Sequence, residues 1–189
     1  MNKFSIGRPD ETEYLPYYGK YISLVPDVDI LSQMSTQAEA TLFLLHSIPE
    51  PQSRFRYAPG KWSIRELVGH VIDTERIFAY RALRFSRNDQ TPLNGYEQDD
   101  YILNSTFDDY PLTELAAEFD SVRRSNIFLF KHLTEEAWTR RGIANDSEAS
   151  VRALAYIIAG HELHHMDILR HKYLPASQAI SWTARHGPE

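Results

Sequence analysis

The stretch that decides the fold runs from Ser150 to Leu174 and reads SVRALAYIIAGHELHHMDILRHKYL. Its apolar residues recur at the i, i+3, i+4, i+7 spacing that gathers side chains on one face of an α-helix. His161 and His165 fall on that face, whereas Glu162 and Asp167 are predicted to point away from it. The stretch therefore predicts a helix whose buried face carries two imidazoles. This face comprises Leu154, Ile157, Ile158, His161, His165, Ile168 and Leu169.

Two buried imidazoles need partners, because an unpaired buried polar group costs about 1–3 kcal/mol. Side chains four residues apart on a helix lie about one turn apart, so His161 and His165 can reach a single ion. Neutral imidazole is a good ligand for Zn, Ni, Cu or Fe. The alternative is a pair of hydrogen-bonded core histidines, and a third histidine from another segment would decide between the two.

The composition is that of one soluble globular domain, with 189 residues, 42% hydrophobic and 24% charged. A net charge of −6 and the lack of a basic stripe argue against a nucleic-acid partner. The chain has no cysteine, which excludes disulfides and cysteine nucleophiles and fits a reducing cytoplasm. The sequence shows neither a signal peptide nor an apolar run of about 18 residues, so we expect a cytoplasmic protein with no membrane partner.

Three further helices are expected before the histidine-rich one, and no segment shows the alternation of a strand. Asp27 or Asp29 is a plausible cap for the first, and Ser63 with Glu66 has the form of a capping box for the second. The pattern predicts an all-α four-helix bundle. The expected helices span residues 27–48, 64–85, 111–133 and 150–174. The expected organisation is an irregular N-terminal arm (1–26), the bundle (27–174) and a C-terminal tail (175–189).

The connecting segments are interpreted as mainly structural. The arm crowds four tyrosines, which are expected to cover a hydrophobic edge rather than line a ligand pocket. Residues 88–101 form a long crossover loop, of the kind that often shapes a site, and residues 134–149 are a connection. The acidic residues of the crossover loop are interpreted as solvated surface. The tyrosines are Tyr14, Tyr17, Tyr18 and Tyr21, and the acidic residues are Glu97, Asp99 and Asp100.

His70 borders the apolar face of the second helix and supplies the third histidine. Glu75 lies about 140° from His70 on that helix, so it is predicted to be a buried carboxylate paired with an arginine or supporting the site. Asp73 and Thr74 are closer to the surroundings of His70. Three protein ligands with one open position are typical of a catalytic zinc site. Three neutral donors leave the ion its full positive charge, which favours hydroxide or thiolate as the fourth ligand.

Two segments together resemble the DinB-like superfamily, which includes the YfiT-like metal-dependent hydrolases. They are PGKWSIRELVGHVIDTE at residues 59–75 and GHELHHMDILRHKYL at residues 160–174. The resemblance implies a four-helix bundle that holds Zn or Ni through His70, His161 and His165. It also implies that two chains associate, and that the reaction is hydrolysis or the transfer of a thiol such as bacillithiol or mycothiol.

Two other motifs overlap the same residues. His161-Glu162-x-x-His165 satisfies the HExxH pattern of zinc proteases, in which Glu162 would be the general base. Such proteases normally hold their peptide on an edge strand, and no strand is legible here. Glu162-x-x-His165 is also one half of a di-iron motif, but Glu66 precedes His70 by four residues instead of three.

The sequence therefore predicts a metal-dependent enzyme that activates water or a low-molecular-weight thiol for reaction with a small-molecule substrate. Its metal ligands are predicted to be His70, His161 and His165, and the chain is expected to form a homodimer. A non-catalytic metal-binding bundle with a role in stress response is the alternative, and a protease is the third hypothesis. Roles for Glu75, Glu162, His164 and the tyrosines stay open at this point.

Overall fold

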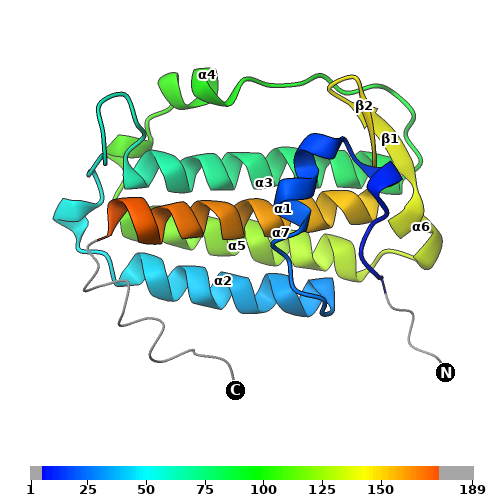
Figure 1. The fold of residues 1–189 in the computed structure, drawn as a ribbon, viewed down its shortest axis with the longest axis horizontal. Coiled ribbons are helices and arrows are strands. Elements are labelled where there is room, and N and C mark those ends of the chain that lie inside the picture. The colour runs from blue at the N-terminus through cyan, green and yellow to red at the C-terminus, as the bar shows by residue number, and fades with distance from the viewer. Residues whose placement is uncertain (1–5, 175–189) are drawn as a thin grey trace.

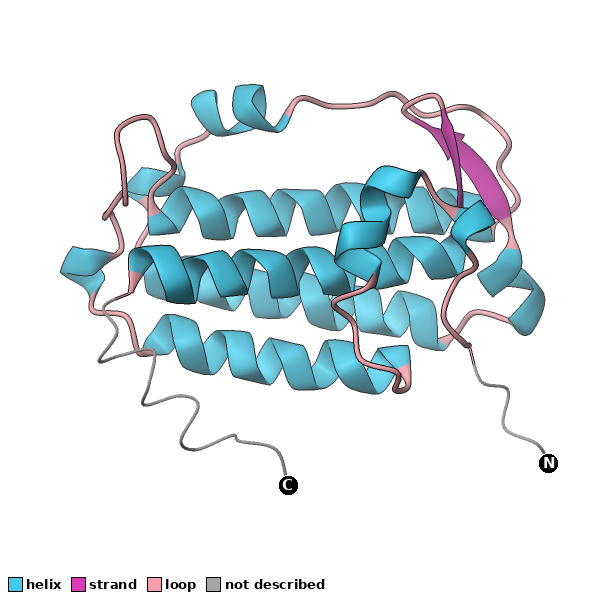
Figure 2. Ribbon diagram, viewed as in Figure 1, coloured by secondary structure: helices cyan, strands magenta, loops and turns pink. Residues whose placement is uncertain are grey.

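The computed structural model describes residues 6–174, and its four longest helices form a bundle (Figures 1 and 2). Two of these helices, α2 and α3, each pack against both α5 and α7. The predicted all-α bundle is confirmed, and the sheet of the described chain is one short hairpin. The long helices are α2 (Ile30–His46), α3 (Ile64–Ser86), α5 (Leu112–Lys131) and α7 (Val151–Ile168).

Short elements connect the long helices. Residues 87–111 cross the whole length of the bundle, so that α3 and α5 run in the same direction (Figure 1). Residues 134–149 are more ordered than the simple connection expected from the sequence. They form a helix and an antiparallel hairpin whose turn places Asn145 and Asp146 at positive φ, a conformation that Asn and Asp tolerate well. The short elements are α1 (Gly19–Ile22), α4 (Gln98–Leu103), α6 (Glu135–Thr139), β1 (Arg141–Ala144) and β2 (Ser147–Ser150).

The predicted helix caps are present. The Asp29 carboxylate accepts a hydrogen bond from the amide of Ser32, and Ser63 and Glu66 form both bonds of a capping box. The last expected helix, 150–174, is divided in two. An α-helix ends at Ile168, and a π-helical turn continues it from Leu169 to Tyr173. Both the C-terminal tail and residues 1–5 of the expected arm lie outside the described residues.

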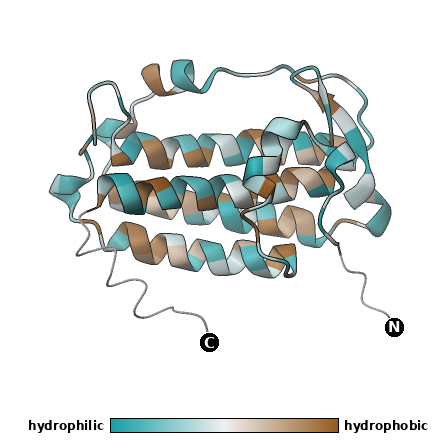
Figure 3. Ribbon diagram, in the orientation of Figure 1, coloured by the Kyte–Doolittle hydropathy of each residue, from teal (hydrophilic) through white to brown (hydrophobic). Residues whose placement is uncertain are grey.

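Apolar side chains pack in two clusters between the helices. Figure 3 shows hydrophobic and hydrophilic segments alternating along the long helices, as expected for amphipathic helices that share a core. One cluster includes Met34, Phe78, Phe130 and Ile158, and the other includes Leu45, Leu67, Phe119 and Met166. None of the helices between residues 6 and 174 is long and apolar enough to span a membrane.

A buried ionic network joins the four long helices. Arg123 of α5 donates two hydrogen bonds to Glu75 of α3, at 2.7 and 2.9 Å, and its Nη1 lies 2.6 Å from Glu162 of α7. From α2, Thr41 donates to Glu162 at 2.7 Å and Gln37 donates to it at 3.1 Å. The Arg123 side chain is fully buried, and the Glu75 and Glu162 side chains are 2% and 1% exposed.

This network shows which roles Glu75 and Glu162 have in the structure. Glu75 is a buried carboxylate, as predicted, and of the two alternatives for its role the structure shows the pairing with an arginine of a neighbouring helix. Glu162 does point away from the histidine face, but it reaches a second buried region of the bundle, so the histidines are not the only polar side chains of α7 in the core. Burial raises the pKa of Glu162, and the charge of Arg123 opposes that shift.

Replacing Arg123 by Met should strongly destabilise the bundle. The substitution leaves two buried carboxylates without their cation, and breaking a buried ion pair costs about 3–5 kcal/mol. We expect a loss of that size in the free energy of unfolding, measured by urea denaturation. Arg124→Met is the matched control, because the Arg124 side chain is 70% exposed and pairs with Asp120 of its own helix. Equal losses in both variants would contradict a structural role for the network.

Candidate metal centre

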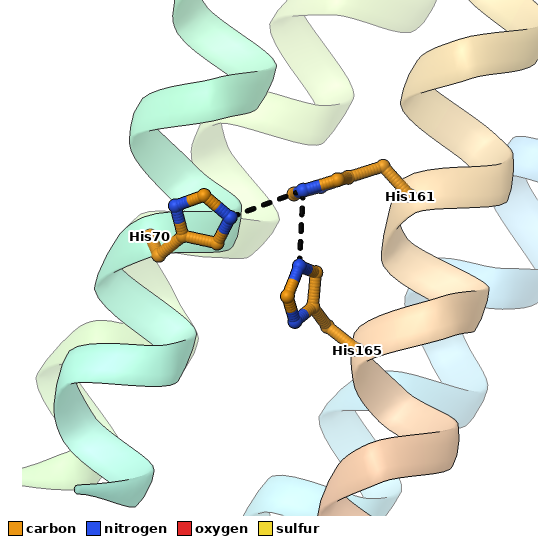
Figure 4. A group of neighbouring side chains, drawn as sticks. All are labelled: His70, His161 and His165. Atoms are coloured by element: carbon orange, nitrogen blue, oxygen red, sulfur yellow. Dashed lines mark hydrogen bonds between the residues drawn. The ribbon is translucent and has the colours of Figure 1, made fainter. Parts of the chain in front are cut away.

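Three histidines from two helices converge in the bundle. His70 of α3 and His161 and His165 of α7 all point toward one place (Figure 4). The Nε2 atom of His161 lies 3.1 Å from that of His70 and 3.0 Å from that of His165. One ligand nitrogen from each ring lies within 4.8 Å of the other two. The structure thus brings together the three histidines that the sequence singled out.

Local sequence explains this convergence. His161 and His165 are four residues apart on α7, so their side chains stack one turn apart on the same face. His70 lies on the side of α3 that packs against α7. The exposed fractions of the three side chains are only 3%, 7% and 9%, in the order His70, His161 and His165.

Burial keeps the imidazoles neutral. It lowers the pKa of His70 to about 4, and no other cause contributes to that shift. Burial also lowers the pKa values of His161 and His165 well below the usual value, and the neighbouring histidines lower them further. Since neutral imidazole is the form that binds metal ions, all three rings are ready to act as ligands at neutral pH.

The donor chemistry of the three rings fits a cation better than a hydrogen-bonded cluster. A neutral imidazole nitrogen either carries one proton or offers one lone pair, so His161 Nε2 cannot form a good hydrogen bond with both neighbours. A cation at the centre would accept a lone pair from every ring. Nitrogen ligands of a tetrahedral zinc ion lie about 3.3 Å from one another, close to the spacing of these Nε2 atoms.

Tyr21 brings the N-terminal arm against the site. Its ring contacts His161 and His164 edge to face, with centroid distances of 5.3 Å in both cases. Helix α1 approaches α7 this closely because Gly160 has no side chain. A Cβ atom at Gly160 would lie 2.1 Å from the backbone oxygen of Tyr21. The tyrosine-rich arm therefore forms part of the site, in contrast to the covering role expected from the sequence.

Two cavities flank the histidines. The first, named here the tyrosine pocket, has a volume of about 210 Å³ and includes His161 in its wall. The second, named the tryptophan pocket, has a volume of about 360 Å³ and includes His165. The tyrosine pocket is lined by Tyr17, Tyr18, Tyr21, Thr74, Phe78, Tyr96, Glu97, Gln98, Ile157 and His161. The tryptophan pocket is lined by Tyr57, Gly60, Lys61, Trp62, Leu67, Gln98, Asp99, His165, Ile168 and Tyr173.

The crossover loop contributes to both cavities through Gln98, in line with the expectation that a long loop shapes the site. Thr74 lines the tyrosine pocket and lies 2.9 Å from the hydroxyl of Tyr96, whereas Asp73 faces Arg76 at 3.8 Å. The predicted acidic cluster of this loop is exposed.

The sequence analysis did not single out Trp62, whose ring centroid lies 4.7 Å from that of His70. Its position immediately before the capping box was the available signal, because the start of α3 leads directly to His70. His164 is partly exposed beside Tyr21, and the exposed His171 bonds to Asp167 of its own helix segment.

Comparison with known proteins identifies the family. A family model described as the DinB superfamily matches residues 33–169. The chain belongs to the DinB superfamily. A relative from Oceanobacillus iheyensis, named "Putative metal-dependent hydrolase OB0413", is 24% identical over 143 residues, which cover 72% of this chain and 79% of that protein.

Two solved structures share the DinB fold. YfiT from Bacillus subtilis, described as a "probable metal-dependent hydrolase with an unusual four-helix bundle topology", has a TM-score of 0.63 and 15% identity, covering 96% of this chain and 94% of YfiT. The DinB-like protein YjoA from Bacillus subtilis has a TM-score of 0.55 and 20% identity, covering 86% of this chain and 94% of YjoA.

Replacing Gly160 by Ala should detach the arm from the site. The new methyl group would overlap the backbone of Tyr21, and overpacking of this kind costs about 1–3 kcal/mol. We expect faster proteolysis within residues 6–25 and a lower free energy of unfolding. Gly19→Ala is the matched control, because the nearest atom to its Cβ would be 3.8 Å away. Equal proteolysis rates for both variants would show that the close approach does not hold the arm.

The metal-free protein should lose stability as the pH falls. The pKa of His70 is about 4 when folded and about 6.5 in its unperturbed state, so between these values the unfolded chain binds more protons. The contribution of His70, on the order of 3 kcal/mol, is present above pH 6.5 and is lost progressively toward pH 4. Urea denaturation from pH 4 to 8 should show this slope, and His70→Gln should reduce it. An equal slope in the variant would contradict the buried neutral histidine.

Proposed function

We propose that the protein is a metal-dependent hydrolase in which His70, His161 and His165 hold one divalent ion, either Zn or Ni. The observation that supports this proposal most directly is the convergence of three buried neutral imidazoles, with cavities beside His161 and His165. A divalent ion with three neutral nitrogen ligands supplies Lewis acidity and lowers the pKa of a bound water or thiol. The names of the Oceanobacillus iheyensis relative and of YfiT support the same class of activity.

The surrounding side chains would orient the reactants. The ring of Trp62 covers His70, and the ring of Tyr21 covers His161, so both ligand rings are held in place and shielded from water. Thr74 and Tyr96 line the tyrosine pocket with their hydroxyl groups 2.9 Å apart, and these groups would form hydrogen bonds with a small-molecule substrate. Burial raises the pKa of Tyr96, so its hydroxyl stays protonated at neutral pH.

Transfer of a low-molecular-weight thiol such as bacillithiol is the second candidate function. It is favoured by the two separate cavities, since a transfer reaction brings two organic reactants to one ion whereas hydrolysis needs only one. The chain has no cysteine, so the thiol would come from outside the protein. A non-catalytic metal-binding bundle would need neither cavity.

Proteolysis through the HExxH pattern finds no support in the geometry. Glu162 would have to act as the general base, but its carboxylate bonds to Thr41, Gln37 and Arg123. Within residues 6–174 the strands are confined to the hairpin at 141–150, so no edge strand lies beside the histidines. Homodimer formation and a cytoplasmic location stay predictions.

Metal content tests the proposal directly. We expect the purified protein to bind about one Zn or Ni ion per chain, and His165→Ala to lower the affinity at least about 100-fold because it removes one of three ligands. Elemental analysis after dialysis measures the content. His171→Ala is the matched control, because this histidine is exposed and bonds to Asp167 of its own helix segment. Stoichiometric metal in His165→Ala, or none in the unmodified protein, would contradict the proposed centre.

Activity is then measured with the same variants. Ester and amide hydrolysis, and consumption of bacillithiol, glutathione or cysteine with an electrophile, are followed in metal-loaded and metal-free protein. Metal-dependent hydrolysis without added thiol supports the first candidate, and metal-dependent loss of thiol together with the electrophile supports the second. Metal binding without either reaction would favour the non-catalytic bundle.

A further inference from the structure

Two cations of the protein lie against the rings of the tyrosine pocket. The Nζ atom of Lys20 lies 3.8 Å from the ring centroid of Tyr17 and 4.7 Å from that of Tyr21. The guanidinium carbon of Arg81 lies 5.0 Å from the Phe78 centroid and 6.0 Å from that of Tyr96. All four rings belong to the wall of the pocket.

Neither cation has a carboxylate partner among residues 6–174. Arg81 is only 4% exposed, and its Nη2 donates to the backbone oxygen of Asn94 at 3.1 Å. A buried guanidinium without an anion is unusual, because the desolvation of a charge is costly unless it is paired. Lys20 is exposed, but its charge reaches the metal centre, where it contributes to the lowered pKa of His161.

Negative charge is scarce around the same cavity. Glu97 is the one acidic residue among those that line it, and this residue is exposed. Asp73 also acts on Tyr96, but it faces Arg76 at 3.8 Å. Lys20 and Arg81 thus place two positive charges against rings of the pocket wall, compared with the one negative charge of Glu97 in the wall itself. In the tryptophan pocket, by contrast, Lys61 and Asp99 offset each other.

The wall of the pocket also carries phenol hydroxyl groups. Burial raises the pKa values of Tyr18, Tyr21 and Tyr96, so that these phenols remain hydrogen-bond donors at neutral pH. An aromatic pocket of this kind could otherwise accept a ligand cation over its ring faces. Here Lys20 and Arg81 already occupy positions against those rings, and a second cation would meet like charges.

We propose that the tyrosine pocket receives the negatively charged part of a small organic substrate, and that Lys20 and Arg81 determine this specificity. The inference rests on the proposed metal-dependent reaction for its catalytic meaning, because His161 forms one wall of the same pocket. The cavity of about 210 Å³ has the volume of roughly seven water molecules, enough for one small ring with a carboxylate.

The test compares three probes of similar shape and different charge: benzoate, benzamide and benzylammonium. Their dissociation constants are measured by NMR titration at pH 7.5 and low salt, with both zinc-loaded and metal-free protein. The measurement on metal-free protein excludes direct coordination of the benzoate carboxylate by the ion. We expect benzoate to bind about tenfold more tightly than benzamide in the metal-free protein, and benzylammonium to bind most weakly.

Charge variants give effects of opposite sign. Lys20→Met keeps the aliphatic contact with the rings and should weaken benzoate about fivefold with benzamide unchanged, whereas Glu97→Gln should strengthen benzoate by a similar factor. Arg81→Met should also weaken benzoate and leave benzamide unchanged. If Arg81→Met does not fold because Arg81 is buried, Lys20→Met still tests the inference, because Lys20 is exposed. Lys131→Met, on an exposed position of α5, is the matched control.

Two results would overturn the inference: benzoate binding no more tightly than benzamide or benzylammonium, or a Lys20→Met variant that does not weaken benzoate relative to benzamide. These outcomes differ from a failure of the metal centre. If the protein binds no zinc, the titration of the metal-free protein still measures the charge preference of the pocket. If zinc binds but benzoate is not preferred, the proposed function stands and the specificity assignment falls.

Discussion

The structure depends on one buried guanidinium. Arg123 binds Glu75 of α3 and Glu162 of α7, the two helices that carry the histidines. Glu162 is adjacent in sequence to His161 but lies on a different side of α7. Its bond to Arg123 therefore sets the rotation of α7 about its own axis, and at this rotation His161 and His165 face α3. Glu75 does the same for His70, which precedes it by five residues. The ionic network therefore orients the two helices that carry the histidine cluster.

The histidine cluster lowers the stability of the metal-free protein. Three imidazoles are removed from water, which lowers their pKa values, and His161 Nε2 can form a good hydrogen bond with only one of its two neighbours. Functional sites often retain such locally unfavourable arrangements, which the packing of the surrounding structure must outweigh. Here the two apolar clusters and the network around Arg123 surround the histidines and hold their helices together.

Segments outside the bundle form part of the pocket beside the histidines. The arm supplies Tyr17, Tyr18 and Tyr21 to the tyrosine pocket, and the crossover segment supplies Tyr96 and Gln98. The rest of the wall comes from α3 and α7 and includes Thr74, Phe78, Ile157 and His161. The bundle provides the three histidines and Arg81, while these segments provide Lys20 and the four tyrosines of the wall. This division agrees with the general tendency of rigid helices to position reactive groups and of loops to determine specificity.

The sequence by itself determined the long helices, two of their caps and the set of three histidines. These features depend on local periodicity, on hydrogen bonds within one turn, and on a spacing of four residues that any helix converts into a shared face. Only the tertiary structure decided that Glu162 is buried against Arg123 and that Tyr21 contacts His161. It also brought Lys20 and Arg81 to one pocket. Those pairings join residues from about 40 to 140 positions apart, and nothing in the local pattern of either partner specifies which distant surface will cover it.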